Sequence, residues 1–351
     1  MRVVADLDNQ FPKQSAYVER AVFAEVMAHA GLYHDGSDAF LQERYPTDKI
    51  SRAVLNRANV DLSTTGNQAA LAESALRSFL VSLAPESAAA ELIRRGVRID
   101  IGRSSLARFP FRSGAPTAAP WVGQGDPIPV VSRTFDGVTI GPAKKIALIS
   151  AITRELAKRA DGEAVVTRVL REDVAAGLDA AYFSTAAASD AANAGLLNGV
   201  SALSGTPGAD AVAMAADLEA LAAAVSENGS GAVVYIMSPK NAARLPIRVP
   251  EIAGRITVLP SHAVANTRII AVDPVSVLHS TDPAPDIVVS RDAVLHMSDV
   301  PLEIVSDTGP TTADPVRSIY QTDGIAIRII AEIAFAKRRS DAVAFINDAS
   351  W

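Results

Sequence analysis

The chain of 351 residues contains no cysteine. That absence excludes disulfide bonds, a thiolate nucleophile and cysteine-ligated zinc. Long apolar runs are absent too: none approaches the roughly 20 residues that span a bilayer. The opening stretch MRVVADLDNQ lacks the apolar region of a signal peptide. We therefore expect a soluble protein without a membrane partner that stays in the cytoplasm where it is made.

Patterns typical of catalysis or metal binding are also missing. The five histidines show no H-x-x-x-H spacing, and the stretch SGTPGAD at 204–210 lacks the lysine and hydroxyl residue of a phosphate-binding loop. Glu172 and Asp173 are adjacent, so on a helix they point to different faces and suit solvated or interface charges. We expect no enzyme activity, no cofactor and no metal site.

Charge is low overall and acidic in sign. Hydrophobic residues make up 49% of the chain and charged residues 21%, which predicts a packed core, while the net charge of −6 argues against tight nucleic-acid binding. One segment departs from this background, with six arginines against one acid. These are Arg94, Arg95, Arg98, Arg103, Arg108 and Arg112. We favour a solvated or subunit-paired basic strand; loose contact with a phosphate backbone is the alternative.

Apolar spacing predicts the elements. It indicates helices over 15–33 and over 67–95, the second interrupted at Pro85. The most continuous apolar stripe lies in 162–183 and predicts a helix on the order of 33 Å long. Short apolar runs between 211 and 311 follow another helix and predict buried strands, so the fold class is α+β. The C-terminal stretch predicts one long strand, a tight turn and a second strand.

A long hairpin-like loop is predicted between two alternating stretches, one at Val97–Ile101 and one at Val138–Leu148. Its tip reads WVGQGDPIPV at 121–130, which is too apolar for an ordinary solvated loop. Loops of this length usually serve function or contact another chain. Pro127 and Pro129 stiffen the tip and so reduce the entropy lost on docking. We interpret the stretch as a strap to another chain; the alternative is that Trp121 is an internal core aromatic.

Several motifs occur in a familiar order. After the tip W-V-x-x-G-x-x-I-P come FDGVTIGPAKKIALISAITREL, a long helix ending LDAAYF, the stretch VVYIMSPKNAARL and the closing TDGIAIRIIAEIAFAKRRSDAVAFI. In this order they resemble the major capsid proteins of tailed bacteriophages, which have the Hong Kong 97-type fold. The resemblance covers about residues 52–347.

The resemblance implies a division of the chain. Residues 1–105 would form an N-terminal helical segment and arm, and 106–150 the extended loop, or E-loop, which lies across a neighbouring subunit. Residues 151–200 and 312–351 would form the peripheral domain with its spine helix, and 201–311 the axial domain. Residues 1–51 fit a processed scaffold remnant, a small arm or a domain of another kind.

The resemblance also implies a function. The chain would be a structural protein that assembles through hexamers and pentamers into an icosahedral shell, formed in the bacterial cytoplasm and packaging double-stranded DNA in the virion. Besides itself, its candidate partners are a portal, a scaffold or protease, decoration proteins and non-specifically contacted DNA. The alternatives are an encapsulin-like bacterial compartment shell, which encloses enzymes, and a soluble α/β enzyme.

The candidate interface residues lie on the E-loop. They are Trp121, Val122, Ile128, Val130 and Arg133. Tryptophan is a favoured anchor at interfaces, and exposed apolar side chains mark contacts with another chain. Some members of the family join subunits by a lysine–asparagine isopeptide bond, but the strand after the tip carries Arg133 where a lysine would be expected. We therefore expect non-covalent assembly.

Overall fold

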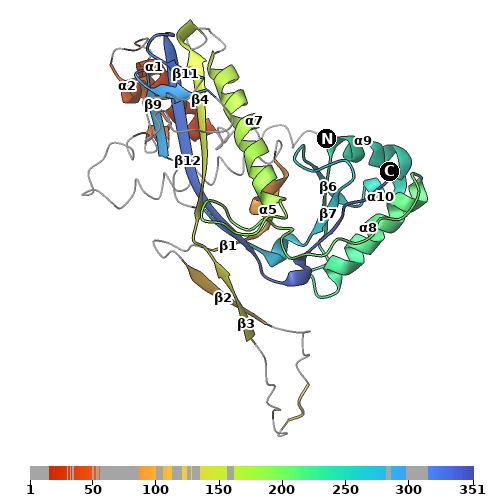
Figure 1. Ribbon diagram of the computed structural model, residues 1–351. Helices are drawn as coiled ribbons and strands as arrows, with labels where there is room; N and C mark the ends of the chain where they lie inside the picture. The colour runs from red at the N-terminus through yellow and green to blue at the C-terminus, as the bar shows by residue number, and fades with distance from the viewer. Residues whose placement is uncertain are drawn as a thin grey trace, which may run out of the picture. The chain divides into compact units, whose positions relative to one another are not determined.

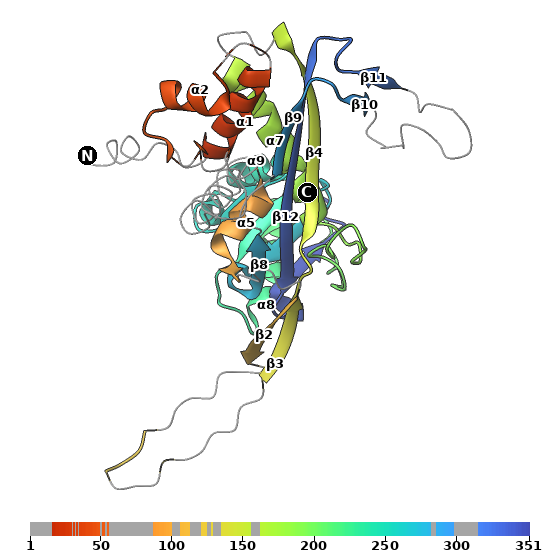
Figure 2. The ribbon, with the colours of Figure 1, turned by 90° about the vertical axis from the view of Figure 1, so that its left-hand side faces the viewer.

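The structure is a computed structural model, and it describes most of the chain. The described residues are 16–29, 31, 33, 35–49, 51–52, 55, 87–99, 106–112, 121–124, 128, 135–155, 162–281, 286–297 and 315–351. They belong to two compact units (Figures 1 and 2). Unit 1 comprises Met1–Glu86, Lys145–Ala175 and Asp282–Glu332; unit 2 comprises Ser87–Lys144, Ala176–Thr281 and Ile333–Trp351.

Unit 1 is built on the long strand β12 (Gly324–Lys337), which continues into unit 2. Strand β9 (Asp286–Ser290) pairs antiparallel with it, and β4 (Lys144–Thr153) is also its hydrogen-bonded neighbour. Along β4 the residues alternate between partly buried and exposed, as the alternating sequence predicts for a strand with one wet face. A small ribbon of β10 (Val294–His296) and β11 (Val316–Ser318) completes the β-structure of the unit.

Two helices near the N-terminus belong to the same unit. Helix α1 (Ala16–His29) packs against α2 (Ser37–Arg44) and against β9, and Figure 2 shows the pair beside that strand. The helix expected within 15–33 is therefore present, and it ends at His29, directly before the turn at Gly31, whose φ is 66°. Such a left-handed turn favours glycine.

Unit 2 contains a four-stranded sheet covered by a helix. In spatial order the strands are β13 (Val343–Ile346), β7 (Ile269–Val272), β5 (Val234–Met237) and β6 (Thr257–Pro260). All residues of β13, β7 and β5 are buried, which explains why they are continuous apolar runs without alternation. Helix α8 (Ala211–Ser226) packs on β13 and β7, and its N-cap Asp210 accepts from the Ala213 amide.

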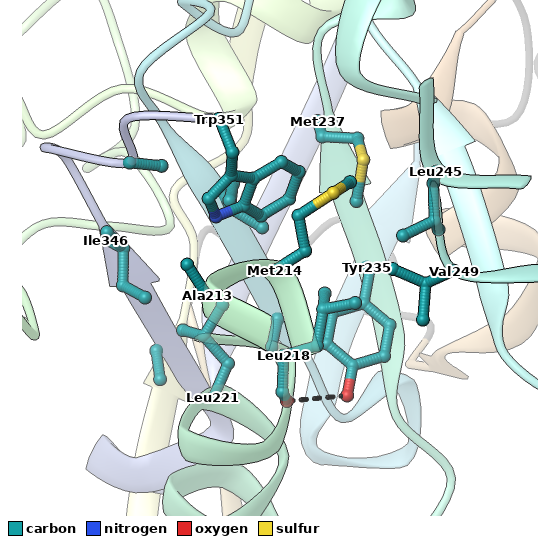
Figure 3. Packing of buried hydrophobic residues seen from close by; sticks show 14 of the residues in the cluster. Ala213, Met214, Leu218, Leu221, Tyr235, Met237, Leu245, Val249, Ile346 and Trp351 are labelled. Carbon is teal, nitrogen blue, oxygen red and sulfur yellow. Dashed lines mark hydrogen bonds between the residues drawn. The ribbon is translucent and has the colours of Figure 1, made fainter. Parts of the chain in front are cut away.

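The core between α8 and this sheet is closed by the last residue of the sequence (Figure 3). Trp351 is 4% exposed and lies among Met214, Met237 and other buried side chains. Its indole Nε1 donates to Asp217 Oδ2 at 2.7 Å. Tyr235, on β5, donates from its hydroxyl to the Leu218 carbonyl at 2.9 Å, so both polar aromatics in this core have a partner.

Short helices follow the central strand of this sheet. Helix α9 (Pro239–Arg248) begins after Ser238, whose side chain accepts from the Asn241 amide. Ser238 is therefore the N-cap of α9, and Pro239 occupies the first helical position, where its missing N–H costs nothing. Helix α10 (Pro250–Ala253) comes directly after it.

The longest helix is α7 (Gly162–Tyr182), as the apolar stripe predicts. In unit 2 it meets α5 (Ala88–Arg95) through Asp179, which is 3% exposed. Its carboxylate accepts from Ser87 Oγ at 2.5 Å, from the amides of Ala88 and Ala89, and from Ser261 Oγ at 2.5 Å. A carboxylate of α7 thus supplies partners to the free amides at the start of α5.

A two-stranded hairpin leaves unit 2. Its strands β2 (Ala107–Arg112) and β3 (Phe135–Ile140) pair antiparallel from Ala107 opposite Ile140 to Arg112 opposite Phe135. In both ribbon views they point away from the core of the unit (Figures 1 and 2). A hairpin is therefore present where the sequence predicted one, but its first strand is β2, not the alternating stretch at 97–101.

Two expectations need correction. The described part of the C-terminal stretch holds three strands, β11, β12 and β13, where two were expected. Asp323 adopts a left-handed φ of 46° in a turn that separates β11 from β12, and the short 3-10 helix η2 (Ser340–Ala342) precedes β13. The strand expected at 97–101 is described only as β1 (Val97–Arg98), which pairs parallel with β8 (Val277–Thr281).

Two further expectations remain predictions. Residues 67–86 of the helix expected over 67–95 lie outside the described residues. The end of that expected helix is α5, which stops before its C-cap Gly96. The four-part domain division is untested.

Candidate intersubunit surface

The hairpin carries large apolar side chains that the single chain leaves in solvent. Trp121 is 103% exposed and Ile128 80%, while Val122 is exposed to 39%. Trp121 as an internal core aromatic is therefore wrong. Val130 and Arg133, which complete the predicted set, lie outside the described residues.

Sequence reasoning missed two further apolar residues on the same hairpin. Leu106, just before β2, is 53% exposed, and Phe135, the first residue of β3, is 67% exposed. For Phe135 a local signal was available, because this large apolar residue directly precedes an acid, Asp136, at the start of a strand; Leu106, between Ser105 and Ala107, carried no such signal. With Trp121, Val122 and Ile128 they are the exposed large apolar residues in the described part of residues 106–140.

The inner end of the hairpin is fixed by a small core. Ile140, at the end of β3, is fully buried and lies in one cluster with Leu278 of β8 and Ala334 of β12. Phe109 and Val138 pack against that cluster. Gly137 leaves room for the Arg108 side chain across the ladder, because a Cβ there would come within 2.5 Å of Arg108 Nε. One end of the hairpin is thus anchored while its apolar tip stays exposed.

The arginine-rich segment is partly neutralised from within. Arg94 and Arg95 both bind Glu91 of their own helix, at 2.5 Å and 2.6 Å. The hydrogen bond from Arg94 is the main cause that lowers the pKa of the Glu91 carboxyl, and the same bond raises the pKa of Arg94.

The other four arginines follow this pair in the sequence. Arg98 and Arg108 are exposed on β1 and β2, Arg112 ends β2, and Arg103 lies outside the described residues. The predicted set is therefore not one free basic patch: two of its members are already ion-paired.

Behind β8 lies a buried polar pair that the sequence did not single out. The Tyr182 hydroxyl and His279 Nε2 are 2.6 Å apart, and the two rings stack with centroids 5.9 Å apart. Burial, with a smaller contribution from the positive charge of Arg98, lowers the pKa of His279 to about 3, and burial raises the pKa of Tyr182. A neutral imidazole and a neutral phenol share the hydrogen bond, which suits a packing role.

A pocket of about 730 Å³ lies at the base of the hairpin. The hairpin side is formed by Phe111, Gly137 and Val138, and charged residues of β12 and η2 line the opposite side. Lys337 Nζ donates to the Asn198 carbonyl at 2.7 Å, and burial lowers the pKa of this amine. The pocket is lined by three basic and three acidic residues, so it does not favour a ligand of one charge sign.

Across the described ranges no group of three or more histidine, aspartate or glutamate side chains is arranged to hold a metal ion. In the same part of the chain, no helix combines the length and the apolar character needed to cross a membrane.

Residues 83–348, more than half of the chain, match the sequence model of the phage capsid family. The chain belongs to the phage capsid family. As a capsid protein it has a structural role, and membership of the family supports self-association into a shell and a place in the virion. The prediction of a tailed-phage major capsid protein is confirmed.

Individual relatives agree with this assignment. The capsid polyprotein of Pseudomonas phage PAJU2 is 28% identical over 284 residues, which are 71% of this chain and 41% of that protein. This capsid protein thus spans about two fifths of the length of that curated relative.

Solved structures show the fold. A chain from Microbacterium phage Oxtober96 is 16% identical with a TM-score of 0.50, covering 75% of this chain and 91% of that one. A chain from Mycobacterium phage Bobi is 14% identical, also with a TM-score of 0.50, covering 73% and 89%. The α+β, Hong Kong 97-type fold class of this capsid protein is therefore confirmed.

Proposed function

We propose that this capsid protein forms an icosahedral shell through hexamers and pentamers, with residues 106–150 acting as an E-loop that lies on a neighbouring copy. One observation carries the proposal: Trp121 is 103% exposed and Ile128 80% exposed on a hairpin whose base is anchored in unit 2. Exposure of these apolar side chains to water does not stabilise an isolated chain. Contact with a second copy would bury them and so contribute favourable binding free energy.

The remaining assignments follow from the same proposal. The peripheral domain would comprise 151–200 and 312–351 with α7 as its spine, the axial domain 201–311, and 1–105 the N-terminal segment. The shell would assemble in the bacterial cytoplasm and package double-stranded DNA, which needs only non-specific contact. A portal, a scaffold or protease and decoration proteins would be further partners. The encapsulin-like and enzyme alternatives are not favoured, because the matches are to the phage capsid family.

The experiment that tests the proposal is assembly of the purified chain, followed by negative-stain electron microscopy and light scattering over a range of protein concentrations. We expect closed shells or capsomer rings for the natural chain. Trp121→Ala removes an interface anchor whose loss costs about 2 kcal/mol per contact, so we expect roughly thirtyfold more protein to be needed for assembly. Deletion of residues 122–130 should leave folded subunits that do not close shells.

A matched variant separates apolar contact from mere disturbance of the tip. Trp121→Phe keeps a large aromatic ring and is expected to assemble at nearly the natural concentration. Circular dichroism and thermal unfolding check that each variant subunit is folded, which the full exposure of Trp121 predicts. Normal shells from the deletion variant would show that the hairpin tip makes no required contact.

A further inference from the structure

Helices α1 and α2 precede the residues that match the capsid family, which begin at position 83. The sequence leaves open whether such a segment is a scaffold remnant, an arm or a separate domain. We propose that residues 16–52 are a permanent structural cover of β9 in unit 1, fastened by charges around Asp323, and not a detachable scaffold segment. That the cover persists in the shell rests on the proposed function.

The first argument is the burial of α1. Residues 21–24 are four consecutive buried positions, with exposed fractions between 0% and 6%, and Val26 is fully buried as well. Four successive residues of an α-helix cover roughly 300° of its circumference. An arm that merely lies on a surface buries one stripe. The burial of α1 shows instead that it is enclosed on several sides, with α2 and β9 among its neighbours.

The second argument is the fit between the two helices. Phe40 of α2 packs against Phe23 and Tyr33, with ring centroids 6.1 Å and 5.5 Å apart. Arg20 of α1 donates to Asp48 Oδ2 at 2.8 Å, and the side chain of that aspartate is only 4% exposed. The same carboxylate accepts from the amide and hydroxyl of Ser51. Residues 20–51 are thus held as one folded piece with its buried charge paired.

The third argument is the attachment of this piece to the sheet. Arg291, just after β9, donates from Nη1 to the carbonyl of His29 at 2.9 Å. His29 is the last residue of α1, where a cation is stabilised by the helix dipole. The guanidinium of Arg291 also lies 4.0 Å from Asp323 Oδ1. The end of α1 is therefore linked through Arg291 to the turn between β11 and β12.

Asp323 is shared by a second arginine. Arg154, which follows β4, lies 3.8 Å from the same Oδ1, and its amide donates to the Asp323 carbonyl at 3.1 Å. A Cβ on Gly31, in the turn after α1, would come within 4.0 Å of Arg154 Nη2. One carboxylate thus stands between two arginines that both reach the end of α1.

The backbone of Asp323 supports a role for its carboxylate. Its φ of 46° is the one left-handed value at a non-glycine position among the described residues. Glycine would adopt this conformation at less cost, and aspartate is one of the few other residues that tolerate it. The negative charge of Asp323 between Arg154 and Arg291 would explain why this position holds an aspartate and not a glycine.

The test is limited proteolysis of the full chain with a protease of broad specificity, with fragments identified by mass spectrometry. In the natural chain we expect residues 16–52 to resist cleavage as long as β9 and β12 do. Asp323→Asn keeps the shape and the tolerance of left-handed φ but removes the charge. Because the Asp323 side chain is 51% exposed and its ion pairs are 3.8 Å and 4.0 Å long, we expect about threefold faster release of the N-terminal fragment. Asp323→Gly should release it equally fast, although glycine relaxes the backbone.

The matched control is Arg168→Ala, which removes an exposed ion pair with Glu172 on α7 and should leave the cleavage rate unchanged. Slower cleavage of Asp323→Gly than of the natural chain would show that Asp323 serves only the turn and would overturn the fastening. Release of residues 16–52 from the natural chain as fast as from Asp323→Asn would overturn it too.

Intact mass of the chain in assembled particles tests the permanence of the cover. Chains that retain residues 16–52 support the proposal, and chains that begin beyond residue 52 contradict it. If no particles form while the helices stay protected in solution, the proposed function fails and the structural cover stands.

Discussion

At the scale of single residues, buried polar atoms in unit 2 are matched to partners far away in the sequence. Asp217 is 1% exposed and accepts from Trp351 Nε1 with one oxygen and from the Thr206 amide, at 2.7 Å, with the other. A buried carboxylate without such donors would cost several kcal/mol. Trp351 therefore stabilises the fold in two ways: it buries apolar area, and its indole N–H donates a hydrogen bond to the buried Asp217 carboxylate.

Trp351→Ala tests this double contribution. The substitution leaves a cavity beside Met214 and removes a donor from Asp217, so we expect a loss of about 3–5 kcal/mol in the free energy of unfolding, measured by urea denaturation. Val212→Ala is the control, because Val212 is 74% exposed and its truncation should stay within about 0.5 kcal/mol. Similar unfolding midpoints for both variants would contradict the assignment of Trp351 to the core.

His279 makes stability depend on pH. Its pKa in the folded chain is about 3, below the ordinary value of 6.5, so the unfolded chain takes up a proton at pH values where the folded chain does not. This contribution to stability is complete above about pH 6.5 and is lost as the pH falls toward about 3.

His279→Gln removes that titration. We expect its free energy of unfolding to fall less steeply than that of the natural chain between about pH 6.5 and about pH 4, whatever the offset between the two curves. The measurement is a series of urea denaturations at fixed pH intervals. His262→Gln, at an exposed histidine, should keep the natural slope. Parallel curves for His279→Gln and the natural chain would refute this account.

At the scale of elements, α5 and α7 are joined by one side chain. Asp179 of α7 takes up donors from the first residues of α5 and from Ser261, so it fixes the start of α5 without any apolar contact of its own. The segment that follows α5 leads through β1 to the hairpin, and the position of α5 therefore helps to set where the hairpin begins.

Asp179→Ala should remove the hydrogen bonds that join α7 to the start of α5. It leaves buried amides of α5 without an acceptor, and we expect a loss of about 3 kcal/mol in unfolding free energy. Hydrogen exchange would show faster exchange of the Ala88 and Ala89 amides before the rest of unit 2. Asp173→Ala, at an exposed acid of the same helix, is the control and should leave both measurements unchanged. Unchanged amide hydrogen exchange at Ala88 and Ala89 in Asp179→Ala would show that Asp179 does not hold the start of α5.

At the scale of the whole molecule, assembly is expected to be non-covalent. Position 133, after the hairpin tip, holds an arginine, and an arginine cannot form the lysine–asparagine bond that joins subunits in some relatives. Purified shells that are boiled in detergent should therefore run as one band near 36.7 kDa, the mass of the chain. A ladder of linked subunits under reducing conditions would contradict this.

The sequence by itself determined the elements and the family. Local periodicity is enough to place α7 and α8, continuous apolar runs are enough to place β5 and β7, and the order of motifs pointed to a capsid protein. Only the tertiary structure decided the pairing of Trp351 with Asp217, of Asp179 with α5, and of α1 with β9. The hydrogen bonds of Asp179 to Ser87 and of Trp351 to Asp217 join residues 92 and 134 positions apart, and the bond from Arg291 to His29 joins residues 262 positions apart. The periodicity of one segment carries no information about such distant partners. The pairing of Arg94 and Arg95 with Glu91 is of the opposite kind, because residues three and four positions apart on one helix are neighbours and such a pair follows from local spacing.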